Sequence, residues 1–176
     1  MDIHTPLSAE KCLTLEAGQK VYISGTIYTA RDQAHMRIVE TLRKGETPPF
    51  PIENSIIFYV GPTPPKPNEA IGSAGPTTSY RMDSFTPYLL EKGLKGMIGK
   101  GERSPDVITS IVENKAVYFV AVGGAGALLS SSIQEAEVIA YPDLGPEAVF
   151  RLKVDKFPCF VAIDSKGNSL FKQANC

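Results

Sequence analysis

The run AVYFVAV, residues Ala116–Val122, decides the fold, because each of its side chains is apolar or aromatic. A strand with one face in water alternates apolar and polar residues, whereas a strand with both faces covered is apolar throughout. The stretches Lys20–Ser24, Ser55–Val60 and Gly96–Ile98 are apolar at their centres in the same way. We therefore expect these strands to be sandwiched between layers.

Apolar runs in the second half of the chain predict further strands over Ala136–Tyr141, Ala148–Val154, Phe160–Ile163 and Ser169–Phe171, the last two flanking a hairpin turn at Asp164–Asn168. Helices are predicted over Ala30–Arg43, over Arg81–Lys92, from Ser104 through Val112, and over the short stretch Leu128–Ser132. Strand–helix alternation followed by a strand-rich tail is typical of an α/β domain with a mixed sheet. A length of 176 residues suits one such domain over residues 1–176.

The predicted helix starts carry capping signals. Thr29 is placed to cap the first helix, with Asp32 three residues later in the capping-box position. Ser104 followed by Pro105 has the pattern of an N-cap and a first helical residue. Pro87 lacks a backbone N–H, so we expect the second helix to restart there.

The charge balance limits the function. Lys plus Arg number 18 and Asp plus Glu number 19, which argues against a general nucleic-acid or polyanion binder. No apolar run approaches the roughly 20 residues that a membrane-spanning helix needs. The N-terminus lacks the basic-then-apolar layout of a signal peptide, so we expect a cytoplasmic protein that binds neither nucleic acid nor membranes.

The cysteines do not predict a metal site within this chain. There are three cysteines, Cys12, Cys159 and Cys176, at wide spacings without a CxxC pair, and only two histidines. Zinc and iron–sulfur sites use closely spaced ligands, so we expect this chain to hold no metal. Cys159 lies in the apolar run FPCFVAI and is most simply a buried core thiol.

Two glycine-rich segments invite functional interpretations. Residues Gly61–Pro76, GPTPPKPNEAIGSAGP, are too rich in helix and strand breakers for regular structure, and a loop this long is usually functional or disordered. We favour function, because the loop leads into a polar motif. Residues Gly123–Ala127 match the dinucleotide fingerprint poorly, since Leu129 stands where its third Gly or Ala belongs. Tight strand-to-helix packing explains this turn better.

Three loops that enter predicted helices each carry a cation. Arg31 precedes the first helix, Arg81 opens the second, and Lys100 lies before the third, with Arg103 close to it. Helix N-termini attract anions, and Arg or Lys adds full charge. If the fold brings these loops together, the cluster suits a small substrate with two carboxylates or a phosphate. The alternative is that these are solvated surface cations.

Two further polar residues, Thr77 and His35, have structural interpretations as alternatives to functional ones. Thr77 precedes the second predicted helix, and on local pattern alone we prefer to interpret it as a capping hydroxyl. His35 lies on the first predicted helix, where it could pair with Asp32 or face solvent. A lone histidine is weak evidence for acid–base catalysis.

Taken together, several motifs resemble one family. They are GTIYTARDQAH (Gly25–His35), GPTTSYRMD (Gly75–Asp83), KGMIGKGERS (Lys95–Ser104), VGGAGALL (Val122–Leu129) and YPDLGPEAVFRLKVDKFPCFVAIDSKGN (Tyr141–Asn168). Nearly the whole chain, from about Leu15 onward, resembles the β subunit, or C-terminal domain, of class I iron–sulfur fumarate hydratase and of the related L(+)-tartrate dehydratase.

The resemblance implies a hydro-lyase that reversibly adds water to fumarate to give (S)-malate. It implies a [4Fe–4S] cluster held by three cysteines of an α subunit, with one iron open as a Lewis acid for the C2 hydroxyl. It also implies a swivelling β/β/α-type domain resembling the mobile domain of aconitase. This chain would then supply half of an active site and would bind no cluster itself.

The resemblance also assigns roles to individual residues. The family's substrate-binding positions correspond to Arg31, Gly75, Arg81 and Lys100. Its proposed catalytic base corresponds to Thr77, in a role that a carboxylate of the partner could share. An alkoxide needs stabilisation, which Lys100, Arg81 and a helix N-terminus could provide.

Two other functions remain open at the level of sequence. The first is the β subunit of L(+)-tartrate dehydratase, which belongs to the same reaction class. The second is a stand-alone anion- or nucleotide-binding module, with the Gly123–Gly126 turn at its ligand.

Overall fold

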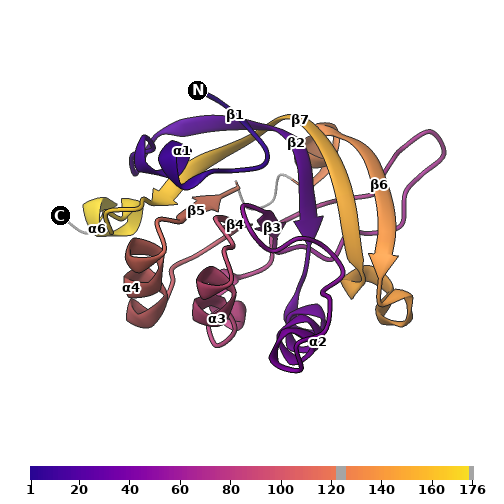
Figure 1. Ribbon diagram of the computed structural model, residues 1–176. Helices are drawn as coiled ribbons and strands as arrows, with labels where there is room; N and C mark the ends of the chain where they lie inside the picture. Colours follow the sequence, from indigo (N-terminus) through magenta and orange to yellow (C-terminus); the bar gives the residue numbers. More distant parts are fainter. Residues whose placement is uncertain (122–125, 175–176) are drawn as a thin grey trace.

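The computed structural model describes residues 1–121 and 126–174 (Figure 1). Its strands are β1 Asp2–His4, β2 Lys20–Thr29, β3 Ile56–Phe58, β4 Gly96–Gly99, β5 Val117–Val120, β6 Ile133–Ala140 and β7 Val149–Ile163. Its α-helices are α1 Ala9–Leu13, α2 Asp32–Arg43, α3 Thr86–Glu91, α4 Pro105–Glu113, α5 Gly126–Ser130 and α6 Leu170–Ala174, and its 3-10 helices are η1 Ser79–Met82 and η2 Pro142–Glu147. The predicted mixed α/β architecture is confirmed. None of these described helices is both long and apolar enough to cross a membrane.

The strands form one mixed, partly closed sheet. The 7-stranded sheet has the order β1-β2-β3-β4-β5-β7-β6, with an additional pairing between β2 and β7. Strands β1 to β5 are parallel, whereas β7 runs antiparallel to β2, β5 and β6. Because β7 pairs with both β5 and β2, it closes a ring of strands. Because β1 to β5 are parallel, their carboxyl ends lie at one edge of the sheet.

Both faces of β3, β4 and β5 are buried, as predicted, but the predicted two-sided burial of Lys20–Ser24 is wrong, because only Val21 and Ile23 on one face of that stretch are buried. Along β3, Ile56 and Phe58 belong to a core inside the ring, and Ile57 belongs to a second core under the helices. The same alternation occurs in β5, where Phe119 points inward and Tyr118 points towards the helices. Figure 1 shows α2, α3 and α4 side by side along that second face.

Strand β7 differs from the sequence prediction, which placed two separate strands in its range. It is a continuous 15-residue strand that changes its pairing partner along its length. Lys156 at its centre has a φ of 51°, and its N–H donates to Ser24 Oγ at 2.9 Å. The polar stretch at the middle of β7 therefore marks a bend in a strand rather than its end.

The predicted strand Ser169–Phe171 is wrong, although the turn before it is present. Within the turn, Asp164 N donates to Asn168 O at 3.0 Å. Ser169 forms only an isolated bridge to Ile163, after which α6 begins. Ser169 Oγ accepts from Phe171 N at 3.3 Å, which resembles an N-cap and favours the helix.

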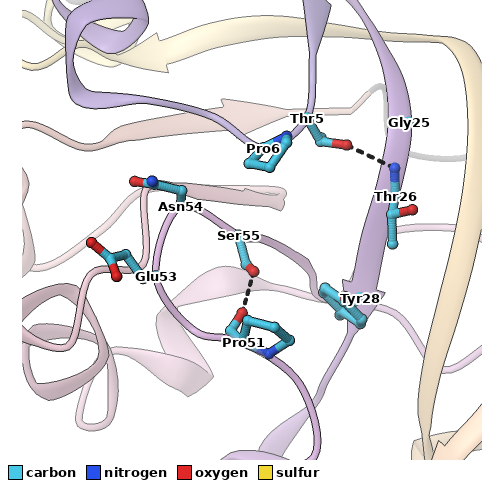
Figure 2. Close-up of a pocket in the computed structure, with 9 residues that line it drawn as sticks. All are labelled: Thr5, Pro6, Gly25, Thr26, Tyr28, Pro51, Glu53, Asn54 and Ser55. Atoms are coloured by element: carbon cyan, nitrogen blue, oxygen red, sulfur yellow. Dashed lines mark hydrogen bonds between the residues drawn. The ribbon is translucent and has the colours of Figure 1, made fainter.

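Strand β2 continues past its predicted end because a bulge lets it keep pairing with β7. The register shifts between Ile23 and Gly25, and Gly25 has a φ of 117°. A Cβ at Gly25 would lie 2.2 Å from Thr5 Oγ1. That hydroxyl accepts from Thr26 N at 2.7 Å, as the upper dashed line in Figure 2 shows. Glycine is required here by both conformation and space.

The extension of β2 also corrects the predicted cap of the first helix. Thr29 is the last residue of β2, and its Oγ1 accepts from Phe150 N at 3.0 Å. Helix α2 begins at Asp32 with Arg31 as its N-cap residue. Thr29 is therefore held by strand pairing and does not cap the helix.

The other predicted helix starts fare better. Ser104 caps α4, accepting from Val107 N at 3.4 Å. The predicted second helix divides into η1 and α3, and Pro87 lies in the first turn of α3, so the restart is confirmed. The short fourth helix is present as α5, two residues earlier than predicted.

Candidate functional site

The loops that leave β2, β3 and β4 place the predicted site residues at one edge of the sheet. Arg31 follows β2 by two residues, and Lys100 directly follows β4. Thr77 reaches the end of β3 from a distant part of the chain, because its N–H donates to Tyr59 O at 2.7 Å. Ligands of open α/β sheets bind outside the carboxyl ends of the strands, which is where these residues lie.

The segment that contains Thr77 runs beside Lys100. Thr78 forms a parallel bridge with Lys100, and Ser79 N donates to Lys100 O at 2.9 Å. A Cβ at Gly99 would lie 1.9 Å from Ser79 Oγ, so the glycine permits the close approach. The backbone thus fixes the spacing between Thr77 and Lys100.

Thr77 does not cap a helix, contrary to the local interpretation of the sequence. The N-cap residue of η1 is Thr78, and it makes no side-chain cap hydrogen bond. The Thr77 side chain is half-buried, and its hydroxyl makes no hydrogen bond to another described residue. The hydroxyl is thereby left available to a ligand.

Arg81 is tied to the start of α2 by an ion pair. Its Nε and Nη2 donate to Asp32 Oδ2 at 3.0 and 2.6 Å. The Arg81 side chain is 49% exposed, so it also faces solvent. Because Asp32 is the neighbour of Arg31, the pair brings η1 to the α2 N-terminus and places Arg81 near Arg31. Asp32 therefore pairs with Arg81 rather than completing a capping box.

Arg31 is the most enclosed of the three cations assigned to substrate. Its side chain is 24% exposed, and its Nε lies 3.9 Å from Glu147 Oε1. A Cβ at Gly61 would lie 3.0 Å from Arg31 Nη1, so the guanidinium lies close against the backbone at Gly61. Arg31 is the N-cap residue of the 12-residue helix α2, whose N-terminus adds a positive dipole end to the site.

Arg103 does not join the cation cluster, so that part of the prediction is wrong. Its side chain is fully buried, and Nε donates to Asp83 Oδ1 at 2.6 Å. Nη2 donates to Thr86 Oγ1 at 2.8 Å, and the guanidinium lies 4.8 Å from the centre of the Tyr118 ring. Arg103 is a structural residue that ties η1 and α3 to the sheet.

His35 is buried rather than solvent-facing, and it has no hydrogen bond to Asp32. Its Nδ1 lies 2.8 Å from Arg31 O, and because a carbonyl only accepts, Nδ1 carries the proton. Burial is the main cause that lowers its pKa to about 4, and the nearby charge of Arg103 lowers it further. A neutral, enclosed imidazole of this kind supports the turn around Arg31.

The long loop Gly61–Pro76 is folded back on itself. Thr63 N donates to Ser73 O at 3.1 Å, and Figure 1 shows the loop extending beyond β6 before it returns. Ala74 N then donates to Gly126 O at 3.1 Å. A Cβ at Gly126 would lie 2.3 Å from Ser73 Oγ, so this glycine permits tight packing. The close neighbour is the long loop, whereas the sequence predicted close packing between a strand and a helix. Gly123–Ala125 lie outside the described residues.

The cysteines within the described residues do not fit an iron–sulfur cluster. Cys12 and Cys159 are buried in the core inside the ring. Burial raises the pKa of the Cys12 thiol to about 12 and also raises the pKa of Cys159, which disfavours the thiolate that a metal needs. The described residues also contain no group of three His, Cys, Asp or Glu side chains that could hold a metal.

Two cavities in the described part of the chain are not lined by the predicted substrate residues. A cavity of about 290 Å³ lies beside the β1–α1 connection. Figure 2 shows the residues that line it, among them Thr5, Gly25, Glu53 and Asn54. A second cavity of about 370 Å³ lies between the long loop and β6, with Ile71, Val138 and Phe150 in its wall. Arg81 and Lys100 instead lie on an exposed edge.

Comparison with known proteins matches residues 1–174 to the family model "Fumarase C-terminus". The chain belongs to this family. A protein of Methanocaldococcus jannaschii provisionally named L(+)-tartrate dehydratase subunit beta is 39% identical over 92% of this chain and 86% of its own length. The Escherichia coli L(+)-tartrate dehydratase subunit beta is 33% identical over 96% of this chain and 85% of its own.

The class I fumarate hydratases are equally similar but much longer. The aerobic enzyme of Salmonella typhimurium is 35% identical over 98% of this chain, which spans 30% of that relative. The resemblance read from the motifs is therefore confirmed. The chain spans most of the β subunits and about a third of the fumarate hydratases that it matches.

The structure shows contacts of the substrate cations that the sequence did not predict. Glu147 lies at Arg31, Asp32 binds Arg81, and Gly61 contacts the Arg31 side chain. The pairing of Arg81 with Asp32 had a signal in the sequence, since each belongs to a motif that carried the resemblance. Glu147 also lies in a motif that carried the resemblance, Tyr141–Asn168, but its contact with Arg31 depends on how the β6–β7 connection folds.

Proposed function

We propose that this chain is the β subunit of a hydro-lyase that removes water from, and adds it to, a four-carbon dicarboxylate. The observation that carries the proposal is the convergence of Arg31, Arg81, Lys100 and Thr77 at the carboxyl ends of β2, β3 and β4. Family membership supports it independently.

The proposed chemistry follows from charge. A dicarboxylate carries two negative groups, and Arg31, Arg81 and Lys100 can form charge-assisted hydrogen bonds with them. In dehydration the base takes the proton from C3, the C2–O bond breaks, and water and the unsaturated acid form. The same cations favour the carboxylate-stabilised negative charge that develops as the C3–H bond breaks.

Thr77 is our candidate for the base at C3. Its hydroxyl is half-buried and has no partner among the described residues, and the backbone holds it beside Lys100. A cation close to a hydroxyl favours the alkoxide form that can accept a proton. Gly75 completes the site by shaping the loop that carries Thr77, as the family pattern implies.

Fumarate and (S)-malate are our first candidates for the substrate pair. L(+)-tartrate is a near-equal second, favoured by one observation: the β subunits of similar length are named for tartrate dehydratase. Tartrate differs from malate by a second hydroxyl at C3, so the substrate choice rests on contacts around that carbon.

The site is incomplete without a partner. Arg81 and Lys100 are exposed, and reactions of this kind need water excluded from the charged groups. In our proposal an α subunit covers this edge and holds the [4Fe–4S] cluster, for which the described cysteines of this chain are unsuited. A swivelling motion like that of the aconitase mobile domain, and a cytoplasmic location, belong to the same proposal.

The proposal is tested by anaerobic assay of this chain co-expressed with its α subunit. We expect water addition or removal with one of the two substrate pairs, and no activity from this chain alone. Calorimetry of the chain alone with NAD and ATP is the control. Activity without the α subunit, or tight nucleotide binding, would contradict a shared hydro-lyase site.

A further inference from the structure

The connection between β6 and β7 is fastened to helix α2 next to the proposed site. Arg37 of α2 donates two hydrogen bonds to Asp143 of η2, at 2.9 and 2.6 Å. The Arg37 guanidinium also lies 5.2 Å from the centre of the Tyr141 ring. These contacts fix η2 against α2, the helix whose N-cap residue is Arg31.

The position of η2 against α2 places Glu147 next to Arg31. Glu147 is the last residue of η2, and its Oε1 lies 3.9 Å from Arg31 Nε. Both atoms are buried, and neither has a hydrogen-bond partner among the described residues. A buried N–H and a buried carboxylate oxygen each gain from pairing, so a small side-chain rotation that closes this distance is favourable.

The backbone at Gly61 also constrains the Arg31 guanidinium. A Cβ at Gly61 would lie 3.0 Å from Arg31 Nη1 and 3.4 Å from Pro146 O. The guanidinium therefore has the backbone at Gly61 on one side and the end of η2 close by. A side chain at position 61 would push on Arg31, so glycine leaves room for this placement.

We propose that Glu147 is a positioning residue that holds Arg31 by its Nε and so sets the direction in which the guanidinium meets a substrate carboxylate. The proposal rests on the proposed function, because it takes Arg31 to bind substrate. Recognition of a carboxylate by arginine depends on the orientation of its planar donors. A guanidinium that Glu147 already holds in one orientation therefore binds the substrate carboxylate at a lower entropic cost.

The test is a double-mutant cycle in the assembled enzyme. We expect Glu147→Ala to lower kcat/KM about tenfold, or about 1.4 kcal/mol, mainly through KM, because Arg31 binds ground state and transition state alike. Glu147→Gln keeps an acceptor oxygen and should lose less. In the Arg31→Ala background, Glu147→Ala should have almost no further effect, because its influence passes through Arg31.

Glu137→Ala is the matched control. Glu137 lies on β6 and pairs with Arg151, and its side chain is 63% exposed. The control removes the same charge without touching η2, and we expect unchanged kinetics. The positioning role would be overturned if Glu147→Ala lowered kcat/KM equally in the wild-type and Arg31→Ala backgrounds. It would also be overturned if Glu147→Ala left the kinetics unchanged. Unchanged kinetics for Arg31→Ala would instead contradict the proposed function.

A second measurement keeps the proposal testable without turnover. In the isolated chain, the Arg31 Nε–H resonance, assigned with Arg31→Lys, should exchange slowly with water, because Glu147 protects it. We expect exchange to become faster in Glu147→Ala and to stay slow in Glu137→Ala. An Nε–H that exchanges equally fast in the wild type and in Glu147→Ala would show that Glu147 does not hold Arg31.

Discussion

The buried histidine His35 gives the chain a stability that depends on pH. Its ring is fully enclosed, Nδ1 donates to Arg31 O, and Nε2 has no hydrogen-bond partner among the described residues. The rings of Tyr59 and Phe85 pack against it, and Arg103 and Asp32 are the charged groups that act on it. Protonation would place a cation in this enclosed site.

The size and sign of the effect follow from the pKa. Burial lowers the pKa of His35 from 6.5 to about 4, which corresponds to about 3 kcal/mol. Between these two pH values the unfolded chain binds the proton and the folded chain does not. The free energy of unfolding should therefore fall as the pH falls from about 6.5 to about 4, by up to about 1.4 kcal/mol per pH unit.

The assay is urea denaturation of the isolated chain from pH 7 to pH 4, compared with His35→Gln and His4→Gln. The chain has two histidines, and His4 is exposed. Carboxylates titrate in the same range but are common to all three proteins, so the difference between curves isolates the histidine. We expect His35→Gln to lose the part of the pH dependence of the free energy of unfolding that is due to the histidine, and His4→Gln to keep it. Identical slopes in wild type and His35→Gln would refute the reasoning.

Two further predictions concern the arginines. Arg103→Met should lower the free energy of unfolding by about 3–5 kcal/mol in urea denaturation, because it leaves the carboxylate of Asp83 unpaired in a buried site. Arg151→Met, which breaks an exposed pair with Glu137, should lower the free energy of unfolding by less than about 1 kcal/mol. Equal losses in the two variants would contradict the distinction between the buried and the exposed ion pair. Arg81→Ala should lower kcat/KM of the assembled enzyme about ten- to hundredfold with little change in Tm, because it removes a charge-assisted bond. Wild-type kinetics in Arg81→Ala would identify it as a surface cation.

The elements that the sequence predicted well are those set by local pattern. The apolar runs of β3 and β5 and the Ser104 cap of α4 require no knowledge of distant residues. Strand β1 and helix α1 were not predicted. Strand β1 has only three residues and is stabilised by pairing with β2, whereas α1 carried a detectable signal, since Ser8 Oγ accepts from Lys11 N.

The site could be predicted only in part, for physical reasons. Local sequence does not distinguish a buried arginine from an exposed one, so Arg103 was considered as a further member of the cation cluster beside Lys100, although Asp83, 20 residues away, pairs with it. Glu147 and Arg31 meet only because η2 packs on α2. The proposed role of Thr77 as the base came from family motifs, and the backbone proximity of its segment to Lys100 is what the structure adds.

Thr77 provides the most direct test of the proposed site. The measurement is exchange of the malate C3 proton with solvent deuterium in the assembled enzyme, comparing Thr77→Ala, Thr77→Ser and Thr78→Ala. Thr78 is the exposed neighbour and serves as the control. If Thr77 is the base, Thr77→Ala loses exchange while substrate still binds, Thr77→Ser retains part of it, and Thr78→Ala exchanges normally. Exchange at the wild-type rate in Thr77→Ala would contradict the account and move the base to the partner subunit.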